Sequence, residues 1–268
     1  MDQDDEVVGG WSLAPAAGRA LRLQVAREAL RRRDPARAIV ELEELLDETP
    51  DDVAALGALA EACSDLRDLP VTREVWRTLI RHGQDQAWVW TQAALTSFAL
   101  ADLDAAHAEA SKAVAKDDTQ AAAWAVLAEV IERREGRAKA WDALDTAHGL
   151  DPIAHPYPLT LDDEAVHTLL AAAFRATTPS VRRFWRGVPR QVHLFPDMAT
   201  LRAATPPLSP RVVALYKGLP PALPEDPERP TALLVFRGNL EHMPSYEEAL
   251  DELTWALEDE AAAWLRES

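Results

Sequence analysis

The acidic run Glu258-Asp259-Glu260 is the group of side chains in this sequence that comes closest to a metal site. Hard cations such as Ca²⁺ prefer oxygen ligands, and neighbouring carboxylates supply them. The surrounding pattern predicts a helix, in which consecutive side chains point about 100° apart. Three consecutive carboxylates therefore do not converge on one ion, and the run favours a solvated helix face over a metal site.

The histidines and the single cysteine show no spacing that binds zinc or activates a nucleophile. Two histidines four residues apart would lie on one helix face, and no two of the seven stand at this spacing. They are His82, His107, His148, His155, His167, His193 and His242. Glu241-His242 lacks the upstream histidine of the inverted zinc motif, and Cys63 has no histidine near it in the sequence. We therefore expect no catalytic residue, no metal and no cofactor.

Four arginines form a short basic stretch at Arg182, Arg183, Arg186 and Arg190. One interpretation is a local patch that binds an acidic partner or a phosphate group. The other, which the sequence favours, is a solvated helix face that pairs with acidic residues of the same chain.

Composition excludes several classes of partner. The 268 residues carry a net charge of −17, whereas a protein that binds nucleic acid or anionic membranes needs a basic face. No segment approaches the roughly 20 apolar residues of a membrane span, and the start MDQDDEVVGG lacks the features of a signal peptide. One cysteine excludes an internal disulfide. We expect a cytoplasmic protein that binds neither nucleic acid nor membrane.

A period of 34 residues runs through the first half of the chain. Pro50 and Pro152 lie three such periods apart, and Trp90 and Trp124 lie one period apart. Repeats of about this length are helix–turn–helix units that bury their apolar faces by stacking. Such stacks usually present a binding surface, so the period predicts recognition rather than catalysis.

The pattern within each period resembles the tetratricopeptide repeat family. The fourth repeat fits best, with Trp124, Ala128 and Pro152 at pattern positions. The second fits least well, because Thr72 and Trp76 replace a small and a Phe-like residue. The predicted repeats are 19–52, 53–86, 87–120 and 121–154, preceded by a flexible acidic segment, 1–18. The resemblance implies an α-helical solenoid of four helix–turn–helix repeats.

In that family, the first helix of each repeat turns a stripe of side chains into a concave groove. The third repeat has the most apolar stripe, consisting of Trp88, Thr91, Leu95 and Phe98. Arg27 and Arg31 belong to the first stripe. The fourth stripe is Ala122, Ala125, Glu129, Glu132 and Arg133. Exposed aromatic side chains are typical binding anchors.

Two interpretations of the third stripe stay open. In one, Trp88, Leu95 and Phe98 hold a peptide, a helix or the C-terminal half of the same chain. In the other, they are ordinary packing residues between repeats. The first interpretation makes this stripe, together with Arg27 and Arg31, the predicted partner-binding groove.

After Pro152 the sequence changes in character, since 15 of the 19 prolines lie from this residue onward and the period stops. A helix is predicted from Asp162 or Asp163 to about residue 176. A capping box at Ser245 and Glu248 predicts a final helix to about residue 264. Between them, the sequence predicts a short helix at 181–186 and strands at 191–195, 211–216 and 231–236. This order predicts a small α+β domain over 155–268.

Three motifs of this second half are similar to those of the small bacterial zincin-like metallopeptidase family. They are PRQVHLFPD at 189–197, ALYKGLP at 214–220, and LVFR at 234–237 followed by YEEAL at 246–250. They cover strands and turns in about 105 residues. The resemblance implies a zincin-like α+β fold whose closing helix would carry the active site.

The chemistry of that family needs His-Glu-x-x-His on the closing helix, where two histidines bind zinc and the glutamate polarises water. Two registers of this sequence match the motif position, and both lack the two histidines. They are Leu257, Glu258 and Ala261, or Asp259, Glu260 and Ala263. Alanine cannot bind a metal, so the resemblance implies a degenerate active-site helix and a pseudo-metallopeptidase.

These inferences predict an adaptor in which the repeat groove binds a protein or peptide partner. The pseudo-metallopeptidase domain would add a non-catalytic surface, and it could itself dock on the groove. The alternative is an active metallopeptidase with a non-standard metal site and repeats that select its substrate. A third possibility is a regulatory subunit that sequesters an active peptidase.

Overall fold

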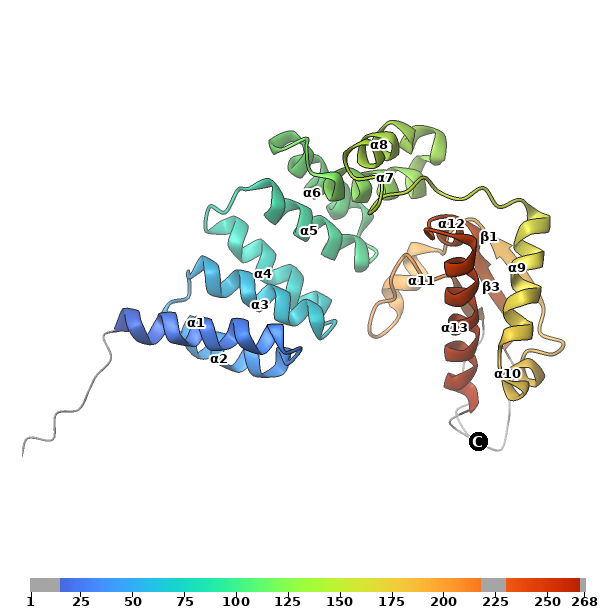
Figure 1. Ribbon diagram of the computed structural model, residues 1–268, viewed down its shortest axis with the longest axis horizontal. Coiled ribbons are helices and arrows are strands. Elements are labelled where there is room, and N and C mark those ends of the chain that lie inside the picture. Colours follow the sequence, from blue (N-terminus) through green and yellow to red (C-terminus); the bar gives the residue numbers. More distant parts are fainter. Residues whose placement is uncertain (1–14, 218–229, 266–268) are drawn as a thin grey trace, which may run out of the picture. The chain divides into compact units, whose positions relative to one another are not determined.

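The computed structural model describes residues 15–217 and 230–265, with side-chain surroundings described from 17 to 262 (Figure 1). By their internal contacts, residues 1–89 and 90–268 form two compact units. This division lies inside a helix of the third repeat, whereas the sequence prediction divided the chain after residue 154.

The first unit contains two complete helix–turn–helix pairs. Helices α1 (Pro15–Arg31) and α2 (Pro35–Glu48) form the first pair. Helices α3 (Val53–Asp65) and α4 (Leu69–Arg81) form the second. Small buried residues let these helices approach closely, and Ala26, Ala38 and Ala55 are all fully buried in one core. Of the predicted flexible segment 1–18, the last four residues belong to α1, and the rest lies outside the described residues.

Two further pairs follow in the same order. Helices α5 (Ala87–Ala99) and α6 (Leu103–Lys116) form the third pair, and α5 begins just before the boundary between the units. Helices α7 (Ala121–Glu135) and α8 (Arg137–Leu150) form the fourth pair. Their shared core contains Ala94, Ala110 and Val126, each of them fully buried.

The turn inside each of the first three pairs has the same backbone conformation. Arg33, Arg67 and Ala101 adopt positive φ angles of 59°, 58° and 57°, and they lie 34 residues apart. An aspartate follows each of them and caps the next helix, with Asp34 accepting from the Arg37 amide and Asp68 from the Val71 amide. Asp102 does the same for Ala105. The predicted period is therefore present in the backbone itself, and the first half is an array of helix–turn–helix pairs.

The part after residue 154 contains the helices and strands that the sequence predicts, and two short helices besides. Helix α9 (Asp163–Ala176) is capped by Asp162, and α13 (Tyr246–Leu265) follows Ser245, whose hydroxyl accepts from the Glu248 amide. The other predicted elements are α10 (Pro179–Phe184), β1 (Arg190–His193), β2 (Ala214–Lys217) and β3 (Ala232–Phe236). Helices α11 (Met198–Ala203) and α12 (Arg237–Glu241) were not predicted.

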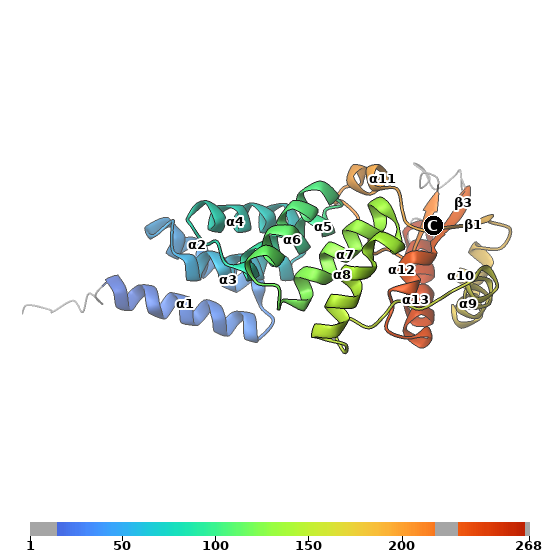
Figure 2. The same cartoon turned by 90° about the horizontal axis from the view of Figure 1, so that it is seen from above.

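The three strands form one sheet in the order β1-β3-β2. Strand β1 pairs with β3 in parallel, and β2 pairs with β3 in the antiparallel direction. Helices α9 and α13 lie side by side against one face of this sheet (Figure 2). Leu233 and Val235 of β3 are fully buried there, and Trp185 anchors the core by donating its indole N–H to the carbonyl oxygen of Leu257 at 3.0 Å.

Within the described ranges 15–217 and 230–265, no helix combines the length and the apolar composition that crossing a membrane requires.

Candidate functional site on helix α7

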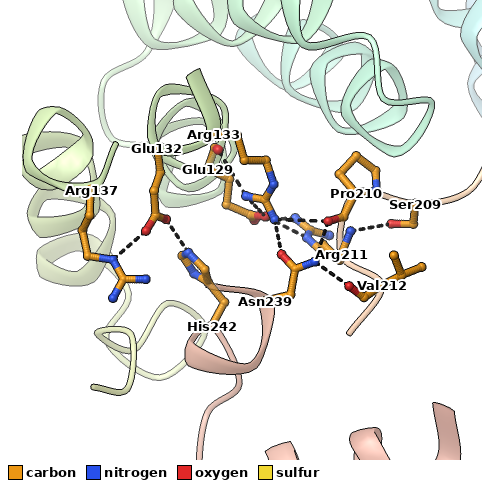
Figure 3. Close-up of polar contacts among 10 residues, drawn as sticks. All are labelled: Glu129, Glu132, Arg133, Arg137, Ser209, Pro210, Arg211, Val212, Asn239 and His242. Carbon is orange, nitrogen blue, oxygen red and sulfur yellow. Dashed lines mark hydrogen bonds and ion pairs between the residues drawn. The ribbon is translucent and has the colours of Figure 1, made fainter. Parts of the chain in front are cut away.

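Three charged residues of the fourth repeat contact the part of the chain after residue 154. Glu129, Glu132 and Arg133 lie on one face of α7, because residues three and four apart are neighbours on a helix. All three belong to the stripe that the sequence predicts to face the groove. Figure 3 shows their polar contacts with α12 and with the loop before β2.

Arg133 lies at the centre of these contacts, and its side chain is only 1% exposed. Its Nη2 donates to Oδ1 of Asn239 at 2.7 Å. The guanidinium also lies over two aromatic rings, 4.9 Å from the centroid of Phe98 and 4.5 Å from that of Phe195. Stacking on aromatic faces suits the planar guanidinium. One buried cation thus joins α5, α7, α12 and the segment after β1.

Asn239 connects the same arginine to the loop before β2. Its Nδ2 donates to the carbonyl oxygens of Pro210 and Val212 at 2.7 and 2.6 Å. The side chain is almost fully buried, with 2% exposed. Because all its polar atoms are bonded, Asn239 fixes the position of this loop relative to Arg133 (Figure 3).

Glu129 binds two arginines. Arg211 donates to both of its carboxylate oxygens, from Nε at 3.1 Å and from Nη2 at 2.7 Å, and Arg133 lies 3.4 Å away. Burial alone would raise the pKa of Glu129, but the charges of Arg211 and Arg133 outweigh it and hold the pKa at about 2. Glu129 is therefore a permanent anion between the two arginines.

A second ionic group lies one helical turn along α7. Nε2 of His242 is 2.5 Å from Oε2 of Glu132, whose Oε1 accepts from Nε of Arg137 at 2.5 Å. Arg137 also contacts Glu241 at 2.8 Å. Burial would raise the pKa of Glu132, but the hydrogen bonds from His242 and Arg137 outweigh it, so the pKa is lowered. These contacts hold the end of α12 against α7.

A pocket of about 320 Å³ adjoins these two groups. Its lining includes small and aliphatic side chains of the third and fourth repeats, such as Leu95, Ala125 and Val126. The polar side chains of Arg211 and His242 also line it. The pocket therefore combines apolar and polar walls.

The residues of the predicted third stripe differ in exposure. Trp88 is 45% exposed, and its ring meets Trp76 edge-on, with centroids 5.9 Å apart. Leu95 lines the pocket. Thr91 is buried, and its hydroxyl donates to Oε1 of Gln120 at 3.0 Å. Phe98 is only 1% exposed, because Arg133 and Arg211 cover it. Thr91 and Phe98 are thus buried while Trp88 is exposed, and the partner-binding role of this stripe stays a prediction.

Arg27 and Arg31 are both exposed on α1. Arg31 pairs with Glu28 on the same helix at 2.5 Å. Both arginines belong to the first unit, and their part in binding stays a prediction.

The predicted degenerate active-site helix corresponds to the second half of α13. Leu257 and Ala261 are fully buried in the core, while Asp259 is exposed. The carboxylate of Glu258 accepts from the Thr178 amide at 3.1 Å. The side chain of Ala263 lies outside the described residues. Among the residues that the structure describes, no group of three or more His, Cys, Asp or Glu side chains is placed to hold a metal ion.

Glu260 has a different role from its two acidic neighbours. Its Oε2 accepts from the backbone N–H of Tyr216 at 3.0 Å. Burial raises the pKa of Glu260 to about 7, with a further increase from Asp259 and a smaller opposing effect of the Tyr216 hydrogen bond. Because Tyr216 lies on the edge strand β2, this carboxyl group caps a backbone donor of the sheet.

Gly238 allows α12 to approach the segment after β1. Its amide donates to the carbonyl oxygen of Leu194 at 2.8 Å, and an added Cβ would lie 2.4 Å from the Phe195 ring and 2.7 Å from that carbonyl oxygen. We expect Gly238→Ala to destabilise the second unit by about 1–3 kcal/mol, because Phe195 and Arg133 must move. Gly149→Ala is the matched control, since its Cβ would meet no atom within 4 Å. Thermal unfolding of both variants checks this, and equal melting temperatures would contradict it.

Comparisons with known proteins give structural likeness only. No protein-family model matches the chain, and no curated protein matches it. A crystal structure of MamA is 18% identical, with a TM-score of 0.49, and the match covers 51% of this chain and 75% of that one. MamA from Desulfovibrio magneticus RS-1 is 20% identical with a TM-score of 0.49, covering 52% and 78%. TTC0263, a thermophilic TPR protein of Thermus thermophilus, is 22% identical with a TM-score of 0.42, covering 53% and 76%.

Sequence reasoning placed the α7 residues on the groove side but did not find their partners. Asn239, Arg211 and His242 come from short segments of irregular sequence, which carry no period. Only the structure reveals the buried face of α12, where four of five residues, Gly238 to Glu241, are buried even though two of them are polar. Buried polar side chains need hydrogen-bond partners, and here the partners come from α7 and the loop before β2.

Proposed function

We propose that this chain is a protein-interaction adaptor whose repeats bind a protein or peptide partner. The observation that carries the proposal is the array of four helix–turn–helix pairs. The first three pairs have the same turn geometry. Such arrays bury apolar faces within the stack and leave extended surfaces for recognition. Trp88 supports it, because a half-exposed indole held edge-on by Trp76 is a rigid anchor of the kind that dominates interfaces.

We also propose that the part after residue 154 docks on the groove side of the fourth repeat. The contacts of Arg133, Glu129 and Glu132 support this, since two of these side chains are 1% exposed. An outside partner would then use the repeats before α7, where Trp88, Arg27 and Arg31 are exposed. The C-terminal part would thus bind the repeats of the same chain.

The same part is proposed to be a pseudo-metallopeptidase that adds a non-catalytic surface. Leu257 and Ala261 support this, because both fill the core at positions where the active motif carries histidines. Elemental analysis of the purified chain distinguishes it from an active metallopeptidase. We expect no bound zinc, and one tightly held zinc ion per chain would favour the enzyme.

Trp88→Ala tests the binding role of the repeats. A partner is first isolated with the full chain and then titrated as a purified protein by calorimetry. We expect the substitution to weaken binding at least about tenfold, since loss of an interface tryptophan commonly costs more than 1 kcal/mol. Trp255→Ala, on α13, is the matched control, because that indole is 61% exposed. Equal weakening by both substitutions, or by neither, would contradict the proposed groove.

A further inference from the structure

The surface around α10 is basic in a chain that is otherwise acidic. Between Glu164 and Asp197 the sequence has five arginines and no acidic residue, although the whole chain carries −17. The arginines are Arg175, Arg182, Arg183, Arg186 and Arg190, and all are exposed. Within the described residues, none of them takes part in an ion pair. The carboxylate of Glu258 lies nearby, where it accepts from the Thr178 amide at 3.1 Å, but it forms no ion pair with these arginines.

Two of these arginines are held in place by neutral contacts. Nη1 of Arg182 donates to the carbonyl oxygens of Arg175, at 2.8 Å, and of Thr177. The guanidinium of Arg190 lies 4.1 Å from the centroid of the Phe174 ring. Both side chains are therefore fixed at the C-terminal turn of α9 while they keep their full charge. A fixed cation loses less conformational entropy when it binds an anion.

Arg190 is also the first residue of β1, which is an edge of the sheet. The amide of Leu233 donates to the carbonyl oxygen of Pro189 at 2.8 Å, and Arg190 is the register partner of Leu233. Since strand residues alternate in direction, the N–H and C=O groups of Arg190 and Val192 point away from β3. All four residues of β1 are exposed. An uncovered edge of this kind pairs readily with another strand.

We propose that this surface binds an extended acidic peptide segment of a partner protein. The peptide would add a strand to the free edge of β1, and its carboxylates would pair with the arginines. A peptide fits better than nucleic acid, because a peptide backbone supplies both acceptors for the edge N–H groups and donors for the edge C=O groups, and the net charge of −17 repels a long polyanion. The proposal rests on the adaptor function in assigning a partner to the C-terminal part.

Fluorescence anisotropy with the full chain and a labelled Asp-Val-Asp-Val-Asp-Val peptide tests the proposal. We expect saturable binding that weakens as salt rises from about 50 to 500 mM, because exposed charge pairs are screened. A Lys-Val peptide of the same length and a thymidine oligonucleotide are the comparison probes. Tighter binding of either comparison probe, or no binding of the acidic peptide, would overturn the proposal.

Two variants test the contributions of the arginine charges and of the strand edge to binding separately. Arg183→Glu with Arg186→Glu is expected to weaken binding at least about tenfold. Arg77→Glu with Lys139→Glu, at exposed positions on α4 and α8, changes the net charge equally and should leave the affinity unchanged. Val192→Pro removes the outward N–H without removing a bond to β3, and we expect a similar tenfold loss.

Hydrogen exchange provides a second measurement if Val192→Pro does not fold. In the unsubstituted chain, the peptide should slow exchange of the Arg190 and Val192 amides and leave the amides of α4 unchanged. Absence of this protection while the peptide is bound would overturn strand addition. Failure of the acidic peptide to bind does not affect the Trp88 titration, so the two proposals fail independently.

Discussion

Replacement of Glu129 by glutamine is expected to lower the free energy of unfolding of the second unit by about 3 kcal/mol. Glutamine keeps the size of the side chain but removes the charge, so Arg133 remains buried at 1% exposure beside Arg211 without its paired carboxylate. The lowered pKa gives a similar magnitude, since a shift from 4.5 to about 2 corresponds to roughly 3 kcal/mol.

The pH dependence identifies the cause of this destabilisation. A carboxyl group whose pKa is lowered in the folded state stabilises the fold above its unfolded pKa, and this contribution is lost as pH falls through the folded pKa. The difference in free energy of unfolding between the two proteins should thus be largest above about pH 5 and vanish towards pH 2. Hydrogen exchange of the α7 and α12 amides in increasing denaturant measures this free energy. Glu135→Gln, an exposed site on the same helix, is the control, and an equal effect there would contradict the assignment.

Replacement of Glu260 by glutamine is expected to stabilise the second unit at alkaline pH by about 2–3 kcal/mol. Burial raises the pKa of this carboxyl group to about 7. Because the pKa of Glu260 is higher in the folded state than in the unfolded state, the folded state binds this proton more tightly. The free energy of unfolding is therefore highest below about pH 4.5 and falls as pH rises to 7. Glutamine stays neutral and can still accept from the Tyr216 amide.

Unfolding of both proteins at pH 5 and pH 8 measures this effect. We expect similar stabilities at pH 5, and at pH 8 a loss in the unsubstituted chain that Glu260→Gln does not show. Asp251→Asn, at an exposed position on α13, should leave the pH dependence unchanged. If the stability of all three proteins declined equally between these pH values, Glu260 would be excluded as the cause of the decline.

The repeats were predictable because their residues recur in register. Ala106 and Ala140 lie one period apart, and both are fully buried, as small residues between stacked helices should be. Elements with strong local signals were also found, such as β3 with its apolar run and α13 with its Ser245 cap. These features depend on residues within one repeat, strand or turn, so the sequence contains them directly.

The contacts of α7 could not be predicted, because they join residues far apart in the sequence. Arg133 and Asn239 are 106 positions apart, and neither belongs to a sequence motif that would predict their contact. The burial of Phe98 could not be decided from the sequence for the same reason. The repeat pattern places Phe98 on the groove side, but the two arginines that cover it are positioned by tertiary packing. The zincin-like resemblance and the partner-binding role of the groove stay predictions.

The recurring turn at Arg33, Arg67 and Ala101 has an evolutionary consequence. At these three places, a residue in the left-handed conformation and a capping aspartate separate the paired helices. A duplication or deletion of 34 residues there would therefore join compatible ends. The fourth turn differs, since Gly136 has a φ of 93° and α8 has no side-chain cap. One repeat could therefore be added or removed at these turns without changing their geometry, whereas the fourth repeat also carries the α7 side chains that contact α12 and the loop before β2.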